Sequence, residues 1–196
     1  MHLIKVTPLI VICSLALSGC SVFGDVSVDI IPYEIVEKSN PFEVRRYERL
    51  VFVSTPMSGG LDSAYGPFRK LFDYISGNNN NTEKIAMTAP VFLDQFEQTT
   101  EKMSFVLPAN FSLSTTPLPK DTAVTLSELR DFKFAVISFS GFLNQGSIST
   151  HRAKLQKWIM GRGFKIIGEP KAAGYNPPFT LPFLRRNEIL IPIEKN

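Results

Sequence analysis

Helical periodicity is confined to two stretches of this chain, and this restricts the folds that it can adopt. In the first stretch, residues 61–75, the apolar residues recur at steps of three and four: Ala64, Phe68, Leu71, Phe72 and Ile75. In the second, residues 147–160, one face carries Ile148, His151, Leu155, Trp158 and Ile159. This spacing is typical of amphipathic α-helices. Glycines close both stretches, as they commonly do at helix ends.

The remainder of the chain is rich in runs that alternate between apolar and polar residues or contain many β-branched ones. We expect strands at residues 44–55, 85–96, 102–107, 123–128, 133–139, 164–168 and 188–193. Strands thus precede and follow each helix, so the chain repeats one pattern twice. Two helices among many short strands predict an α+β fold, with the helices packed on a curved, mostly antiparallel sheet.

The first nineteen residues have the composition of a secretion signal. Lys5 supplies a positive charge, residues 6–17 are mostly apolar, and the tetrapeptide Leu-Ser-Gly-Cys ends at Cys20. The apolar run is shorter than the about 20 residues with which a helix crosses a bilayer. The tetrapeptide resembles the lipobox of bacterial lipoproteins, in which the cysteine is lipidated and becomes the new N-terminus. An ordinary signal peptide with a chance cysteine is the alternative.

We therefore expect a signal peptide over residues 1–19, the lipidated Cys20 with a tether over residues 20–30, and a folded domain over residues 31–196. Ser21 stands where an aspartate would retain a Gram-negative lipoprotein in the inner membrane. The expected location is consequently the bacterial cell envelope, with the domain anchored by lipid to the outer membrane and facing the periplasm.

Charge and cysteine content argue against a nucleic-acid-binding protein and against a disulfide-stabilised one. Loss of residues 1–19 removes Lys5 and changes the formal charge from +3 to +2, and no block of lysine or arginine provides a basic face for nucleic acid. Of the two cysteines, Cys13 leaves with the signal and Cys20 carries lipid. No disulfide is then available, and stability must come from a packed core.

Familiar catalytic and metal-binding constellations are missing from the mature chain. Its single histidine is His151, and it contains no Gly-x-Ser-x-Gly turn, so a nucleophilic triad is hard to assemble. One histidine without a free thiol does not suffice for an ordinary zinc site. A glycine-rich phosphate loop is absent as well. We therefore expect neither an enzyme nor a metalloprotein of these types.

Two longer motifs indicate the class of protein more specifically than these absences do. The first is Lys-Ile-Ala-Met-Thr-Ala-Pro-Val at residues 84–91, preceded by Phe-Asp-Tyr-Ile-Ser-Gly-Asn-Asn at residues 72–79. The second is Gly-Tyr-Asn-Pro-Pro-Phe at residues 174–179, followed by Leu-Arg-Arg-Asn-Glu-Ile at residues 184–189. With Tyr47 in the early strand, these motifs resemble the SOUL family, also called the heme-binding protein family. The resemblance covers residues 32–194.

Membership of this family implies a distorted, mostly antiparallel β-barrel made of two pseudo-symmetric halves, each with one packed α-helix. It also implies non-covalent binding of heme or another porphyrin, without catalysis, in an apolar cleft beside the first helix. The residues expected at such a site are Tyr65, Phe68, Arg69, Leu71, Phe72, Ile75 and Arg185. A porphyrin needs a broad apolar face, and its propionates need cations at the rim.

Each of these residues also has a structural interpretation. Phe68, Leu71, Phe72 and Ile75 have the spacing of a helix face buried against the sheet, which leaves Tyr65 as the expected exposed contact. Arg185 and Arg186 could hold the preceding proline-rich loop through carboxylates such as Glu188. We interpret His151 as a packing residue and Met87 as core filling, so we expect no axial ligand.

The sequence departs from the animal heme binders at two places. Asp73 stands where a basic residue is expected near the end of the first helix, and the loop at residues 179–183 lacks lysine. Both differences remove positive charge from the neighbourhood of the propionates. Two functions remain open: a membrane-tethered carrier or buffer for a tetrapyrrole, and an envelope module whose cleft binds a protein or peptide. A role in binding small effector molecules is a third.

Overall fold

The computed structural model describes residues 28–59, 61–94 and 101–195. The expected signal peptide and Cys20 lie outside these residues. The α-helices are α1 (Tyr65–Ile75) and α2 (Gln145–Gly161), and short 3-10 turns are η1 (Leu61–Ser63) and η2 (Pro182–Leu184). The strands are β1 (Asp29–Ile30), β2 (Glu34–Ser39), β3 (Phe42–Pro56), β4 (Thr88–Ala89), β5 (Val91–Asp94), β6 (Lys102–Val106), β7 (Thr125–Phe139), β8 (Phe164–Ile166), β9 (Lys171–Gly174) and β10 (Asn187–Lys195).

Six of the strands close into an antiparallel barrel. The pairing runs β3, β6, β5, β9, β10 and β7, and β7 pairs again with β3. Closure leaves no free edge among these six strands. The strand β2 extends the sheet beyond β3, while β8 pairs with the far end of β10. The α+β class and the barrel are thus confirmed.

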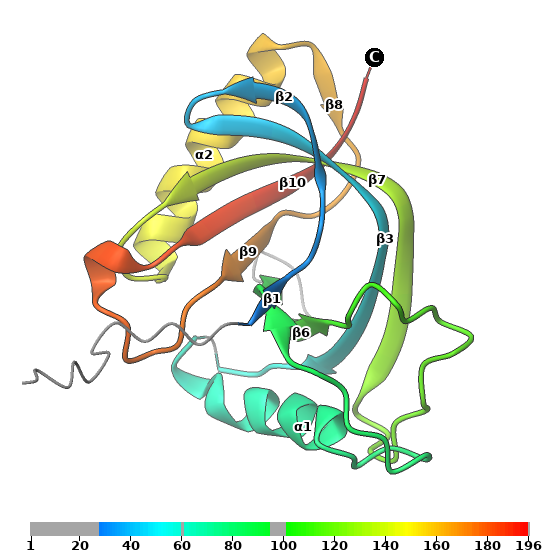
Figure 1. Cartoon of the computed structure of the whole chain (residues 1–196). Helices are drawn as coiled ribbons and strands as arrows, with labels where there is room; N and C mark the ends of the chain where they lie inside the picture. Colours follow the sequence, from blue (N-terminus) through cyan, green and yellow to red (C-terminus); the bar gives the residue numbers. More distant parts are fainter. Residues whose placement is uncertain (1–27, 60, 95–100, 196) are drawn as a thin grey trace, which may run out of the picture.

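The barrel consists of two halves with the same pairing scheme. In the first half a long strand, β3, is followed by α1, and β3 then pairs with β6, which pairs with β5. In the second half the long strand β7 is followed by α2, and β7 pairs with β10, which pairs with β9. The predicted repeat is therefore present in the topology. Figure 1 shows the two helices on separate parts of the outer surface, with the strands between them.

Two strands expected at residues 123–128 and 133–139 form one continuous strand, β7. The expected break falls at Asp131, which has a positive φ of 46°. Its counterpart Glu48 on β3 is skipped in the register at the same point, between the pairs of Tyr47 with Phe132 and of Arg49 with Arg130. One residue on each strand is left out of the pairing, so the register is the same on both sides of this level. The ladder therefore bends here without ending.

The folded part begins earlier than Ile31, the residue expected to start it. Asp29 and Ile30, which we assigned to the tether, pair in parallel with Thr88 and Ala89. Short strands at residues 34–39 and 171–174 were not expected at all, because the first is largely exposed and the second contains small residues. Conversely, the strand expected at residues 85–96 begins only at Thr88, and Pro90 separates β4 from β5.

Side chains form two apolar clusters on opposite faces of the barrel wall. The smaller cluster receives residues from all six barrel strands and none from the helices, so it fills the barrel interior. The larger one joins the outer face of the wall to the inner faces of α1 and α2. Within the described residues, no helix has the length and apolarity that a membrane span requires.

Candidate functional site

The helix α1 has two apolar faces. Leu71, Tyr74 and Ile75 are buried against the barrel. The other face carries aromatic rings exposed to solvent: Tyr65 is 76% exposed, Phe68 37% and Phe72 48%. Since these three residues are spaced at i, i+3 and i+7, their side chains lie along one side of the helix.

The exposed aromatic side chains are held in place by their neighbours. The rings of Phe68 and Phe72 stack with centroids 6.2 Å apart and planes at 13°. Phe68 also meets the edge of the buried ring of Phe105 on β6, with centroids 5.2 Å apart. The face is therefore a supported apolar platform. We name it, with Tyr65, Phe68 and Phe72, the α1 aromatic face.

This arrangement corrects part of the sequence interpretation. Phe72 and Phe68 were interpreted as members of the buried stripe together with Leu71 and Ile75, but only Leu71 and Ile75 are buried. The barrel contacts the helix over a strip too narrow for all four side chains. Of the residues expected to contact a ligand, Leu71 and Ile75 thus belong mainly to the core, although Ile75 also reaches the cleft described next.

A cleft of about 340 Å³ adjoins the C-terminal end of the α1 aromatic face. Its lining consists of Phe72, Ile75, Ser76, Lys84, Ile85 and Met87. Half of these residues come from the end of α1 and half from the Lys-Ile-Ala-Met motif after it. The volume lies near the lower end of the range of ligand pockets, which is about 300–1,000 Å³. This α1 cleft can receive one edge of a flat apolar ligand that lies along the helix.

The turn between α1 and the motif is fixed by one buried side chain, Asn79. Its amide nitrogen donates to the carbonyl oxygens of Tyr74 and Glu83, at 3.1 and 2.7 Å. Its amide oxygen accepts from the backbone N–H groups of Asn81 and Glu83. The backbone N–H of Ile85 then donates to the carbonyl oxygen of Ile75 at 2.8 Å. The cleft is consequently preformed.

Three cations lie on or beside this face. Arg69 and Lys70 are exposed on α1, and Lys70 lies 3.7 Å from a carboxylate oxygen of Asp121. Lys84 is exposed and lines the cleft itself. From the sequence, Lys84 was recognised only as part of a motif and was not expected at the site. It supplies positive charge near the end of α1, where Asp73 had suggested that charge was lacking.

Arg185 does not line the α1 cleft. Its guanidinium donates to the carbonyl oxygens of Thr180 and Pro178, at 2.7 and 2.5 Å, and lies 5.2 Å from the centroid of the Phe142 ring. It therefore holds the proline-rich loop between β9 and β10, through backbone carbonyls. Arg186 is the arginine that pairs with Glu188, at 2.8 Å.

Most of a buried polar network inside the barrel was not predicted from the sequence, which indicated only a pairing of Arg185 or Arg186 with Glu188. Glu188 on β10 and Arg45 on β3 are both buried, and they form two parallel hydrogen bonds of 2.8 and 3.0 Å. Glu188 also accepts from Tyr175, Ser138 and Arg186, each within 3.0 Å. A carboxylate within an otherwise apolar strand was the sequence signal that could have revealed this network.

The network keeps Glu188 ionised. Burial alone would raise the pKa of this carboxyl, but the hydrogen bonds and charges of Arg45 and Arg186 hold its pKa below the usual value. Burial raises the pKa of Tyr47, beside the network, to about 12. With each partner satisfied, we assign the network a structural role at the junction of the two halves.

His151 is a packing residue, in agreement with its interpretation from the sequence. Its ring stacks on Phe139 with centroids 3.9 Å apart and planes at 6°. The Nδ1 atom lies 2.7 Å from the carbonyl oxygen of Ser147 and donates to it. Met87 is half-buried and packs against the core, although it also lines the α1 cleft. Among the described residues, no cluster of three or more His, Cys, Asp or Glu side chains could hold a metal ion.

Two known proteins are similar to this chain in sequence. Heme-binding protein 1 of Xenopus laevis is 26% identical over 157 residues, which cover 76% of this chain and 81% of the relative. Heme-binding protein 2 of Homo sapiens is 30% identical over 175 residues, which cover 84% of this chain and 83% of the relative.

A solved structure of low sequence identity shares the fold. The C-terminal domain of EcmrR superposes with a TM-score of 0.59 at 11% identity, covering 84% of this chain and 99% of that domain. The profile of the SOUL heme-binding protein family matches residues 28–192, which is most of the chain and includes both the α1 cleft and the barrel network. This chain belongs to the SOUL heme-binding protein family.

Proposed function

We propose that this protein binds heme or another tetrapyrrole non-covalently at the α1 aromatic face and cleft, as a membrane-anchored carrier or buffer without enzymatic activity. The observation that carries the proposal is the row of three exposed aromatic rings leading into a preformed cleft with Lys84 at its rim. The names of its relatives, heme-binding proteins 1 and 2, support the same ligand class.

The physical basis of binding is burial of the macrocycle. An apolar ring that covers Tyr65, Phe68 and Phe72 removes apolar surface from water, at about 25 cal/mol for each Å². Aromatic rings add stacking contacts of about 0.5–1.5 kcal/mol per pair. Lys84 and Arg69 provide charged donors for carboxylates such as the propionates. None of these terms involves the iron.

Titration with heme and with metal-free protoporphyrin tests the binding mode. We expect both to bind the mature chain, residues 20–196, with similar affinity, since the contacts act on the ring. Tyr65→Ala and Phe72→Ala should each weaken both ligands, by about tenfold for a loss of about 1.4 kcal/mol. His151→Ala should weaken neither, because the stacked His151 lies on α2. Absorption spectra of folded variants, checked by circular dichroism, provide the measurement.

Met160→Ala is the matched control, because it removes an exposed apolar side chain from α2. If heme binds far more tightly than protoporphyrin and His151→Ala abolishes the difference, His151 is an axial ligand and the proposed mode is wrong. If neither ligand binds more tightly than about micromolar, near −8 kcal/mol, the carrier proposal gives way to a module that binds a protein or peptide.

Membrane anchoring rests on the sequence around Cys20 and has its own test. We expect Cys20→Ala to leave an unacylated chain that no longer fractionates with membranes, because each buried methylene of an acyl chain contributes about 0.8 kcal/mol. Fractionation of cells after a high-salt wash measures this. A variant that remains with the membranes would contradict the lipobox interpretation, and Ser21→Ala should fractionate as the unaltered protein does.

A further inference from the structure

Two adjoining cavities lie where α2 ends, and neither shares a residue with the α1 cleft. The first measures about 370 Å³ and is lined by Val36, Glu37, Val44, Lys133, Arg162, Gly163, Phe164, Ile193, Glu194 and Lys195. The second measures about 450 Å³ and is lined by Phe42, Lys154, Lys157, Trp158, Gly161 and Arg162. Arg162 borders both cavities, so together they form one site, which we name the α2-end site.

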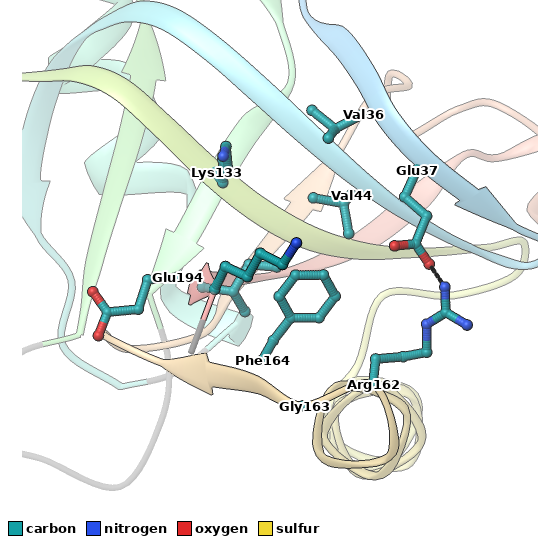
Figure 2. A pocket seen from close by; sticks show the side chains of 10 residues that line it. Val36, Glu37, Val44, Lys133, Arg162, Gly163, Phe164 and Glu194 are labelled. Carbon is teal, nitrogen blue, oxygen red and sulfur yellow. Dashed lines mark hydrogen bonds and ion pairs between the residues drawn. The ribbon is translucent and has the colours of Figure 1, made fainter.

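The α2-end site has an apolar wall that runs from one cavity to the other. In the second cavity the rings of Phe42 and Trp158 stack with centroids 5.2 Å apart and planes at 11°. Trp158 continues to Phe164 in the first cavity, with centroids 6.3 Å apart. Figure 2 shows the ring of Phe164 turned toward the side of the cavity from which Val44 projects.

The charges around this wall are predominantly positive. The carboxylates of the site are already paired: Glu37 with Arg162, the ion pair drawn in Figure 2, and Glu194 with Lys165 at 2.8 Å. The four lysines that line the site are Lys133, Lys154, Lys157 and Lys195. Throughout the described part of the chain, none of the four has a carboxylate within ion-pair distance.

We propose that the α2-end site binds an amphipathic organic anion, that is, an apolar chain that carries a carboxylate or phosphate. The apolar part lies along Phe42, Trp158 and Phe164, where its burial removes surface from water. The anionic group meets the lysine ammoniums through charge-assisted hydrogen bonds. Unpaired carboxylates at the site would repel an anionic ligand, but Glu37 and Glu194 are both neutralised by ion pairs. The site is separate from the α1 cleft, so this proposal goes beyond tetrapyrrole binding.

Trp158 makes the site directly observable, because it is the only tryptophan in the sequence. The mature chain, residues 20–196 with Cys20→Ser to omit the acyl group, is titrated with dodecanoate and with dodecyl phosphate below their micelle concentrations. We expect a saturable change in tryptophan fluorescence with both anions. Dodecyltrimethylammonium, with the same chain and the opposite charge, should produce none. Calorimetric titration in parallel measures binding independently of fluorescence.

Charge-removing variants locate the anionic group. Lys133→Gln combined with Lys195→Gln should weaken dodecanoate binding by about tenfold or more, since both substitutions remove a charged donor for the carboxylate. Both lysines are exposed, so the fold is retained. Lys84→Gln, at the α1 cleft, is the matched control and should leave dodecanoate binding unchanged.

Three results would overturn the proposal. The first is equal binding of the cationic and anionic amphiphiles, which would indicate unspecific adsorption to an apolar patch. The second is anion binding that the double lysine variant leaves intact, or that Lys84→Gln abolishes, because the anion would then lie elsewhere. The third is absence of binding in both fluorescence and calorimetry.

Discussion

Glu188→Gln is expected to lower the free energy of unfolding by about 3–5 kcal/mol at neutral pH, the usual cost of breaking a buried ion pair by removal of one partner. The glutamine keeps the size of the side chain but not its charge. Arg45 then remains buried with Glu43 as its remaining carboxylate partner, and Tyr175 and Arg186 lose an ionised acceptor. Denaturant unfolding monitored by circular dichroism measures the loss.

The pH dependence of this loss follows from the pKa of Glu188. The folded protein holds this pKa below its usual value, so the ionised form stabilises the fold above the unfolded pKa of about 4.3. That stability is lost as the pH falls through the lower, folded pKa. The difference between the unaltered protein and Glu188→Gln should therefore be largest at neutral pH and shrink steadily below about pH 4.

A surface carboxylate on the same strand provides the control. Glu194 also lies on β10, but its ion pair with Lys165 is exposed to solvent. Exposed pairs contribute about 0–1 kcal/mol to stability. Glu194→Gln should therefore change the free energy of unfolding by no more than about 1 kcal/mol. Equal effects of the two substitutions would mean that Glu188 is hydrated in solution, and the assignment of the network as a buried structural element would fail.

The second large effect concerns the two faces of α1. Leu71→Ala should lower the free energy of unfolding by about 2–5 kcal/mol, because Leu71 is completely buried and its removal leaves a cavity. Phe72→Ala removes a larger side chain from the next position, yet it should cost much less, since nearly half of the ring is exposed. Thermal or denaturant unfolding of the two variants gives the comparison.

Ligand binding should show the opposite order. Phe72→Ala weakens a porphyrin at the α1 aromatic face, whereas Leu71→Ala affects binding only as far as it loosens the helix. If Phe72→Ala is as destabilising as Leu71→Ala, the ring is buried in solution, as the helical periodicity had suggested. The aromatic face would then be too small for the proposed ligand.

Local sequence patterns were sufficient for the elements and their order. Both helices occur where the apolar spacing placed them, since amphipathic periodicity directly reflects contact with one surface. The strand runs likewise matched β3, β6, β7, β8 and β10 in position. Errors occurred where the local signal is weak: at the exposed β2, at the short β9 with its two alanines, and at Asp131, where a turn was expected and a bent strand continues.

The motifs were sufficient to locate the candidate site, but not to predict which of its side chains are exposed or which partners they contact. The helical periodicity places four apolar residues on one broad side of α1: Phe68, Leu71, Phe72 and Ile75. The width of the contact with the barrel decides which of these side chains are buried. Arg185 and Arg186 are adjacent and chemically identical, yet one holds loop carbonyls and the other a buried carboxylate. The direction in which each side chain points, inside or outside, determines this.

The sequence by itself determined that this chain is an α+β protein of two repeated halves, because the order and periodicity of its elements are local properties. Only the tertiary structure decided that Arg45 and Glu188, 143 residues apart, meet inside the barrel, and that residues from β2, β3, β7 and β10 line a cavity where α2 ends. Such contacts depend on closure of the barrel through pairing of β3 with β7 and β5 with β9. No local pattern records that closure, because it joins residues that are distant in the chain.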